Sequence, residues 1–379
     1  METGQRGLKT LNTSPDTARD AARGRFVTQT GWTDAKIEAF PGDASNRRYF
    51  RLHRGAQTAI LMDAPGGAEA PACPPEADRA QREQLGYNAM ARLAGPNTAA
   101  FAAISQALTQ RGFSAPRIFE ADLDSGFLLI EDLGDDLFAR IIPHKAHEGA
   151  LYAQAVETLA AIYRSSFERE PEAFGHRWTI QDYDPVAMQA EIDLFIDWYA
   201  PYRGNGAVND ATRAQWHTAW ATLFPALDAH APGLALRDYH AENLLWLPER
   251  DGQARTGLID FQDGLMVHPA YDLVSLIEDA RRDVAPDLEA PLKDRFFNAA
   301  QLNDREAFEA AYAVLAAQRN AKILGVFVRL MKRDNKPRYE QFMGRVARHF
   351  IKDIAHPALS EVQGLVKEIA PQVYEDAQQ

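Results

Sequence analysis

Residues 37–62 consist of short runs in which apolar and polar residues alternate. The runs IEAF, RRYFRLH and TAILM are separated by PGDASN and RGAQ, two segments that contain turn-forming residues. Because such alternation is typical of strands that bury one face, we predict a three-stranded antiparallel meander. Residues 63–79 are rich in Pro, Ala and Gly and predict a loop, whereas residues 81–112 carry apolar residues at helical spacing and predict a helix.

A second pair of strands is predicted after that helix, because residues 117–121 and 127–130 flank LDSG, a sequence that suits a tight hairpin turn. Farther along the chain the spacing of apolar residues becomes helical. Residues 234–261 are an exception, since short apolar runs alternate there with charged residues and predict short strands. The helical stripes are Leu151, Ala155, Leu159 and Ile162, and Met188, Ile192, Phe195 and Tyr199.

The pattern of apolar residues changes near Leu133, from short alternating runs to mainly helical spacing. We predict an α+β fold in which a small, antiparallel β-rich lobe, residues 26–132, precedes a larger and mainly helical lobe, residues 133–379. Residues 1–25 are polar and lack hydrophobic periodicity, so we expect a mobile tail there. Residues 286–379 contain no motif that we can interpret.

Composition narrows the classes of function. The 379 residues, of which 46% are hydrophobic, can bury at least one large core. The formal net charge is -12 and no long basic run is present, so we expect no nucleic-acid partner. A single cysteine, Cys73, excludes an intramolecular disulfide framework and a cysteine zinc cluster.

The sequence also bears on location. The N-terminal segment lacks the apolar region of a signal peptide, and no stretch approaches the roughly 18 consecutive apolar residues of a membrane span. We therefore expect a cytoplasmic protein without a membrane partner, and we expect it to be a monomer.

The strongest chemical signal is RDYHAEN at residues 237–243, which is followed by Asp260 at the end of an apolar run. Phosphoryl transfer needs a carboxylate that deprotonates the acceptor hydroxyl and oxygen ligands that hold Mg²⁺ against a triphosphate. Asp238 suits the first task, and Asn243 and Asp260 suit the second. Taken alone, each residue is better explained structurally, Asp238 and Asn243 as turn formers and Asp260 as the end of a strand. Together they favour a kinase, since unpaired carboxylates in apolar runs would cost several kcal/mol.

Three of these segments, LRDYHAENLLW, GLIDFQDG and YDLVSLIEDAR, resemble the aminoglycoside phosphotransferase family. DASNRRYFRL, LMDAP, GFLLIEDLGDDL and EIDLFIDWY resemble more closely its branch of anomeric N-acetylmuramate/N-acetylglucosamine kinases, and the similarity runs from about residue 37 to about residue 285. The resemblance implies a two-lobed, protein-kinase-like fold that binds ATP and Mg²⁺. It also implies phosphorylation of an amino sugar, at the anomeric hydroxyl, in cell-wall sugar recycling.

The resemblance places the nucleotide at two segments. The first matches the nucleotide loop, where backbone N–H groups and a hydroxyl would cover the phosphates; its residues are Asp43, Ala44, Ser45 and Asn46. The second matches the connection between the lobes, where backbone groups near Glu131 and Leu133 would pair with the adenine edge. From the residues alone, a hairpin turn and an acidic strand exit remain open for these segments.

The chain departs from protein kinases at the third strand, where residues 59–62 contain no lysine to hold the phosphates. Another cation would have to replace it, and Arg47, Arg48 and Arg51 on the preceding strand are the candidates, with Arg48 among the expected nucleotide contacts. Strand alternation puts Arg48 on one face and the other two on the opposite face. At least one face is expected to hold solvated arginines only.

The resemblance also implies that Asp272 helps to hold the catalytic loop and that the acceptor binds to helices inserted in the large lobe. Aromatic residues that stack on sugars and carboxylates that accept their hydroxyls occur within residues 183–202. The candidates there are Asp193, Asp197, Trp198 and Tyr199, with His240 of the catalytic segment as a further candidate. An ordinary amphipathic helix and a hydrogen-bonded structural histidine remain the alternatives.

Two other functions stay open. One is a kinase for a different small molecule, such as an aminoglycoside, a choline-like compound or another sugar. The other is a nucleotide-binding pseudoenzyme that regulates a partner, because the third-strand lysine is missing.

Overall fold

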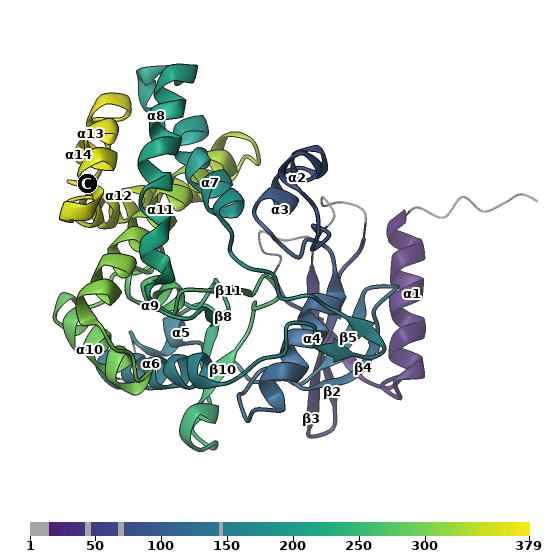
Figure 1. Cartoon of the computed structure of the whole chain (residues 1–379). Helices are drawn as coiled ribbons and strands as arrows, with labels where there is room; N and C mark the ends of the chain where they lie inside the picture. Colours follow the sequence, from purple (N-terminus) through teal and green to yellow (C-terminus); the bar gives the residue numbers. More distant parts are fainter. Residues whose placement is uncertain (1–14, 42–46, 67–71, 144–146) are drawn as a thin grey trace, which may run out of the picture. The chain divides into compact units, whose positions relative to one another are not determined.

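The computed structural model describes residues 15–41, 47–66, 72–143 and 147–379. The backbone packs into two compact units (Figure 1). The first comprises Met1–Glu69 with Ile118–Asp132, and the second comprises Ala70–Arg117 with Leu133–Gln379. This differs from the predicted division, because residues 70–117 group with the helical part of the chain.

The first unit is built on a five-stranded antiparallel sheet, and the predicted meander and hairpin are confirmed in it. The strand order is β1-β2-β3-β5-β4. The strands are β1 Lys36–Ala39, β2 Arg48–Arg54, β3 Gln57–Asp63, β4 Ile118–Asp122 and β5 Phe127–Ile130.

Helix α1, Pro15–Gln29, packs against one face of this sheet (Figure 1). Phe26 and Val27 of the helix are buried together with Leu61 of β3 and Phe127 of β5. The prediction of a mobile tail was therefore wrong for residues 15–25; residues 1–14 lie outside the described part. The sequence did not predict this helix because arginines such as Arg19 and Arg23, rather than a stripe of apolar residues, hold its first turns to the sheet.

Arg19 and Arg23 of α1 bind Asp63, which is completely buried at the end of β3. The nitrogen-to-oxygen distances are 2.7 Å from Arg19 and 3.4 Å from Arg23. Arg48, the register partner of Asp63 on β2, completes the cluster at 2.8 Å. Three guanidinium groups thus neutralise one buried carboxylate and fasten α1 to the sheet.

The second unit is mainly helical, and short strands support its central loops. The strand pairs are β6 Glu172–Ala173 with β7 His176–Arg177, β8 Gly233–Ala235 with β11 Leu265–Val267, and β9 Leu244–Trp246 with β10 Thr256–Leu258. The helices are α2 Arg79–Leu85, α3 Tyr87–Met90, α4 Thr98–Thr109, α5 Phe138–Ile141, α6 Glu148–Arg164, α7 Pro185–Leu194, α8 Asp210–Ala221, α9 Ala270–Ile277, α10 Glu289–Ala299, α11 Arg305–Lys332, α12 Met343–Asp353, α13 Ser360–Ile369 and α14 Val373–Asp376.

The single helix predicted over residues 81–112 was wrong, because three helices occupy that span. Gly86 ends α2 with a positive φ of 94°, and Asn97 caps α4 through a bond from the Ala99 N–H. Ion pairs of 2.7 Å from Arg82 and 3.0 Å from Arg92 join this segment to Asp184 at the start of α7. These contacts explain why residues 70–117 belong to the helical unit.

Helix α11 runs through the core of this unit and packs against α7, α9 and α12. Gly325 of α11 lets this helix pack closely against the end of α7, since a Cβ atom there would lie 2.2 Å from the carbonyl oxygen of Leu194. At Leu194 the predicted apolar stripe leaves α-helical geometry, and two π-helical turns follow, Phe195–Tyr199 and Pro201–Asn205. Among the described residues no helix combines the length and the apolar content that a membrane crossing requires.

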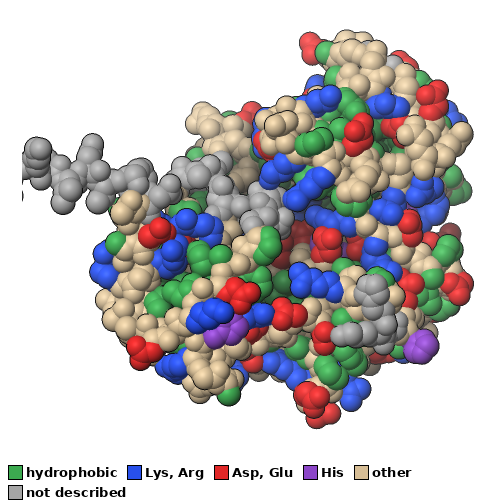
Figure 2. Space-filling model, turned by 180° about the vertical axis from the view of Figure 1, so that it is seen from behind, with side chains coloured by type: hydrophobic (Ala, Val, Ile, Leu, Met, Phe, Trp, Pro, Cys, Tyr) green, Lys and Arg blue, Asp and Glu red, His purple; other side chains and the backbone are tan. Residues whose placement is uncertain are grey.

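Acidic and basic side chains lie interspersed on the face of the molecule drawn in Figure 2. Exposed ion pairs of the chain include Arg169 with Asp182 at 2.7 Å and Arg295 with Glu157 at 2.9 Å. Exposed pairs of this kind contribute about 0 to 1 kcal/mol each, so they add little to the stability of the fold.

Two buried histidines, His230 and His268, lie beside the N-terminus of α9. His268 Nδ1 accepts a bond from the Ala270 N–H at 3.2 Å, and its Nε2 lies 3.1 Å from His230 Nδ1. The other nitrogen of His230 lies 2.6 Å from the Asn303 carbonyl oxygen. This chain of bonds requires both rings to be neutral. Burial, with help from His230, lowers the pKa of His268 to about 3.

We predict that Asp63→Asn lowers the free energy of unfolding of the first unit by about 3 kcal/mol, because it leaves three arginines around a neutral side chain. Hydrogen exchange of the β2 and β3 amides measures this local loss. Asp124→Asn, the same substitution on an exposed turn, is the control and should change exchange little. Equal exchange in the two variants would contradict the role given to Asp63.

We predict that stability falls on acidification through His268. Its pKa drops from 6.5 unfolded to about 3 folded, so the unfolded chain binds more protons in that range and stability is lost as pH falls through it. The loss from this group between about pH 7 and about pH 5 should be about 2 kcal/mol in urea titrations. His268→Asn, which cannot titrate, should remove that part of the pH dependence. An unchanged slope would refute the prediction.

Candidate active site

The segment that follows β8 carries Asp238 and is held by Asp272 of α9. The carboxylate of Asp272 accepts bonds from the Leu236 N–H at 2.6 Å and the Arg237 N–H at 2.9 Å. Arg237 has a left-handed φ of 71°, a strained conformation for a non-glycine residue. The pairing of β8 with β11 brings this segment beside α9. The implied role of Asp272 in holding the loop is thus confirmed.

The side chain of Arg237 is buried and enters a network centred on Glu191 of α7, which is completely buried as well. Glu191 binds Arg237, and it lies 3.0 Å from Lys322 Nζ of α11 and 2.5 Å from the Tyr183 hydroxyl. Burial alone would raise the pKa of Glu191, but Lys322 and Arg237 outweigh it and lower the pKa to about 2. A permanent carboxylate therefore ties the loop to two helices.

Sequence reasoning missed this network. Glu191 and Lys322 occur in amphipathic helices, where a charged residue normally faces solvent. Only a weak signal was present in the sequence. Arg237 directly precedes Asp238 in a largely apolar segment, and a buried arginine there would need an acidic partner from elsewhere in the chain.

Asp238, Asn243 and Asp260, which the sequence predicted as a group, lie together. Antiparallel pairing places Leu244 of β9 opposite Leu258 of β10, so Asn243 adjoins the residues that follow β10. Asn243 Nδ2 donates to the Asp238 carbonyl oxygen at 3.0 Å and lies 3.5 Å from Asp260 Oδ2. Asp260 has a left-handed φ of 59°, the second strained residue of the site.

The carboxylate of Asp238 is ionised at neutral pH. Burial raises its pKa, but the positive charges of Lys322 and Arg319, among other neighbouring groups, outweigh burial and hold the pKa below its ordinary value. An ionised, partly desolvated carboxylate can accept a proton from a hydroxyl group.

Asn243 and Asp260 fit a magnesium ion. The amide nitrogen of Asn243 is used in the two contacts above, which leaves its amide oxygen as a ligand. Gln262 Nε2 orients Asp260 by a bond of 3.0 Å to Oδ1. In the described part of the chain no three His, Cys, Asp or Glu side chains gather to hold a metal alone. Two oxygen ligands completed by phosphates and water are the usual environment of Mg²⁺ beside a nucleotide.

His240 belongs to the same loop and is neutral. Its Nε2 lies 3.1 Å from Arg281 Nη1 and 3.5 Å from Asn243 Nδ2. Burial lowers its pKa to about 4. The ring therefore accepts a hydrogen bond from Arg281 and stiffens the loop between Asp238 and Asn243.

The candidate nucleotide residues are only partly described. Asp43, Ala44, Ser45 and Asn46 lie outside the described residues. Arg48 lies on the face of the sheet that α1 covers and binds Asp63. Arg51 lies on the opposite face, where its Nε is 2.8 Å from Asp132. Glu131 and Leu133 are half-buried and follow β5 outside any helix or strand.

The predicted acceptor residues of the helical segment make other contacts. Asp193 and Asp197 face α8, where they lie 2.9 Å from His217 and 2.5 Å from Arg213. The buried Tyr199 stacks on Phe195 and donates its hydroxyl to Asp376 in α14. Trp198 is half-buried. The described contacts of Asp193, Asp197 and Tyr199 therefore join helices to one another, not to the loop of Asp238.

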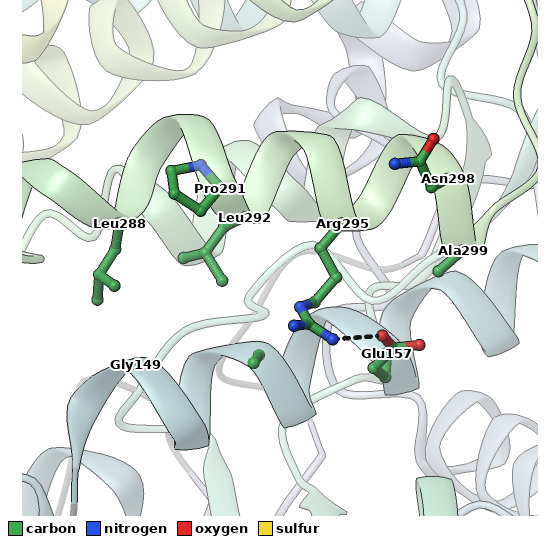
Figure 3. A pocket seen from close by; sticks show the side chains of 9 residues that line it. Gly149, Glu157, Leu288, Pro291, Leu292, Arg295, Asn298 and Ala299 are labelled. Atoms are coloured by element: carbon green, nitrogen blue, oxygen red, sulfur yellow. Dashed lines mark hydrogen bonds and ion pairs between the residues drawn. The ribbon is translucent and has the colours of Figure 1, made fainter.

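Two cavities lie in the second unit. One, of about 660 Å³, lies between α6 and α10 and is bridged by the Glu157–Arg295 ion pair (Figure 3). The other, of about 420 Å³, is lined by Glu242 of the loop that carries Asp238, by residues just beyond α9, and by residues of and near α5 and α12. No residue that the sequence predicted for the site lines either cavity, but the second adjoins the loop of Asp238 through Glu242.

Solved structures of similar shape confirm the kinase-like fold. A choline/ethanolamine kinase family protein from Mesorhizobium loti matches with a TM-score of 0.55 and 17% identity, over 92% of this chain and 99% of that one. The gentamicin complex of APH(2'')-IIa matches with a TM-score of 0.52 and 11% identity, over 90% of this chain and 99% of that one. These likenesses concern the fold alone.

Sequence relatives are closer. A protein of Caulobacter vibrioides named N-acetylmuramate/N-acetylglucosamine kinase is 42% identical over 353 residues, which are 93% of this chain and 97% of that protein. A protein of the same name from Pseudomonas aeruginosa is 27% identical over 90% of this chain and 91% of its own length. The model of the phosphotransferase enzyme family matches residues 36–317. The resemblance found in the sequence is confirmed, and the chain belongs to the phosphotransferase enzyme family.

Proposed function

We propose that this phosphotransferase transfers the γ-phosphoryl group of ATP to an amino sugar, N-acetylmuramate or N-acetylglucosamine, at the anomeric hydroxyl. The observation that carries the proposal is the grouping of Asp238, Asn243 and Asp260 on one held loop, in a chain 42% identical to a relative of that name. We also propose that it acts in cell-wall sugar recycling, in the cytoplasm and as a monomer.

Asp238 acts as the general base. It takes the proton of the sugar hydroxyl while the oxygen attacks the γ-phosphorus, a new phosphorus–oxygen bond forms, and the bond to the bridging oxygen of ADP breaks. The ionised state of Asp238 suits this task. A general base of this kind contributes roughly a hundredfold to ten-thousandfold to the rate.

Asn243 and Asp260 hold Mg²⁺, which would neutralise phosphate charge when bound. The loop of Asp43, Ala44, Ser45 and Asn46 is proposed to cover the phosphates, and the backbone near Glu131 and Leu133 to pair with adenine. For the cation that replaces the missing lysine, Arg51 is better placed than Arg48. Both arginines are paired, Arg51 with Asp132 and Arg48 with Asp63, but Arg51 lies on the face that α1 leaves uncovered, whereas Arg48 lies on the face that α1 covers.

The pseudoenzyme alternative loses support, because Asp238, Asn243 and Asp260, the proposed base and the proposed metal ligands, lie together. Choline and aminoglycosides, the other acceptor classes, are suggested only by structures of low identity. No contact in the described residues favours either of them specifically.

We predict that Asp238→Asn lowers kcat for sugar phosphorylation by at least a hundredfold while ATP still binds, since only the proton acceptor is lost. Phosphorus NMR of purified protein with Mg-ATP and each amino sugar measures the product. Asp251→Asn, the same change at an exposed position of the same unit, is the control. Full activity of Asp238→Asn would overturn the assignment of the base.

We predict that Asp272→Asn lowers kcat about tenfold to a hundredfold with a smaller effect on KM for ATP. An asparagine has one acceptor oxygen, so it satisfies only one of the two N–H groups that hold residues 236 and 237. Steady-state kinetics give both constants, and circular dichroism checks the fold. A change confined to KM would argue against a role in positioning Asp238.

A further inference from the structure

Four basic side chains surround the loop of Asp238, and they differ in what they can bind. Arg237 and Lys322 share the carboxylate of Glu191 in the protein interior. A ligand that displaced Glu191 would leave a buried carboxylate unpaired, which costs several kcal/mol. Arg319 is 5% exposed and donates to the Ser275 hydroxyl at 2.7 Å. Arg319 Nη1 has no hydrogen-bond partner among the described residues, but it is buried. These three cations are therefore less accessible to a ligand than the fourth.

Arg281, the fourth, is accessible. It lies just beyond α9, and its side chain is 31% exposed. Nη1 lies 3.1 Å from His240 Nε2, and Nε lies 3.0 Å from the Glu242 carboxylate, which is 49% exposed. Both partners lie within four residues of Asp238 in the sequence. An exposed pair such as Arg281–Glu242 is worth about 0 to 1 kcal/mol, so another carboxylate can replace Glu242 at little cost.

Arg281 also lines the cavity of about 420 Å³ that includes Glu242. The other arginines of this cavity bind carboxylates outside the loop of Asp238: Arg345 binds Asp283, which also lines the cavity, through two nitrogens at 2.7 and 2.8 Å, and Arg282 binds Glu148 at 2.7 Å. Arg281 is thus the arginine of the cavity that contacts the catalytic loop itself.

The same cavity contains polar atoms that a ligand would satisfy. Asp279 is 1% exposed, and its Oδ2 has no hydrogen-bond partner among the described residues. The buried Nε of Arg282 also lacks one in that part of the chain. The other carboxylate oxygen of Asp279, Oδ1, accepts a bond of 2.8 Å from the backbone N–H of Arg281, which keeps Asp279 beside Arg281. A buried acceptor and a buried donor without partners are typical of a site for a polar molecule.

The two sugars in the proposed function differ in charge. N-acetylmuramate is N-acetylglucosamine that carries a lactyl ether, and the ether ends in a carboxylate. A kinase for both must place the shared sugar ring at the base and accommodate the carboxylate near it. A guanidinium group binds a carboxylate through two parallel N–H bonds.

We propose that Arg281 binds the lactyl carboxylate of N-acetylmuramate in place of Glu242, and so sets the preference between the two acceptors. The inference rests on the proposed function. Asp279 Oδ2 then accepts a hydroxyl of the same sugar. N-acetylglucosamine binds the site without engaging Arg281, which keeps its pair with Glu242.

The test is the ratio of kcat/KM for N-acetylmuramate to kcat/KM for N-acetylglucosamine, measured with saturating Mg-ATP. Arg281→Gln should lower this ratio at least tenfold, mainly through KM for N-acetylmuramate. Arg281→Lys, which keeps the charge but loses the two parallel N–H groups, should give an intermediate ratio. Glu242→Gln removes the competing carboxylate and should shift the ratio in the opposite direction.

Arg295→Gln is the matched control, because Arg295 forms a similarly exposed pair with Glu157 at the other cavity (Figure 3). Its ratio should equal that of the unmodified protein. Equal losses for both sugars in Arg281→Gln would overturn the proposal and assign Arg281 to the transferred phosphoryl group or to the fold. An unchanged ratio would also overturn it. If the unmodified protein phosphorylates neither sugar, the proposed function itself fails.

Discussion

The site depends on one buried carboxylate that holds a strained backbone. Asp272 accepts two N–H groups from residues 236 and 237, and this fixes Arg237 in a left-handed conformation that it would not adopt alone. The side chain of Arg237 is then directed inward to Glu191, so that Asp238, the next residue, faces the site. Asp238 is ionised because the same interior supplies positive charge. The bonds of Asp272 thus fix the backbone that carries the proposed base, and the nearby cations Lys322 and Arg319 keep that base ionised.

The first unit uses the same chemistry for a different purpose. Asp63 is buried and gathers Arg19, Arg23 and Arg48, which attaches a polar helix to an apolar sheet face. In both units a buried acid is tolerated because basic side chains from distant segments neutralise it; in the second unit this acid is Glu191, which pairs with Arg237 and Lys322. The consequence for function is that Arg48 is occupied, and Arg51 on the opposite face becomes the better candidate for a nucleotide contact.

The acidic partners of the basic side chains around Asp238 differ in whether a ligand can replace them. Glu191 is completely buried and cannot be replaced by a ligand, whereas Glu242 is half-exposed and its pair with Arg281 is weak. An anionic acceptor is therefore compatible with a protein whose net charge is -12, because the local field at the loop is set by a few arginines and not by the total.

The sequence by itself determined the strands of the sheet, the helical second unit and the group Asp238, Asn243 and Asp260, because periodicity and motif spacing are local properties of a chain. The sequence did not predict features that depend on long-range contacts. Helix α1 was predicted as a tail, because Asp63, which stabilises it, lies far along the chain. The network of Glu191 and Lys322, and the cavity beside Arg281, were equally absent from any local pattern. Only the tertiary structure decides which charges are buried together, because burial depends on segments distant in sequence.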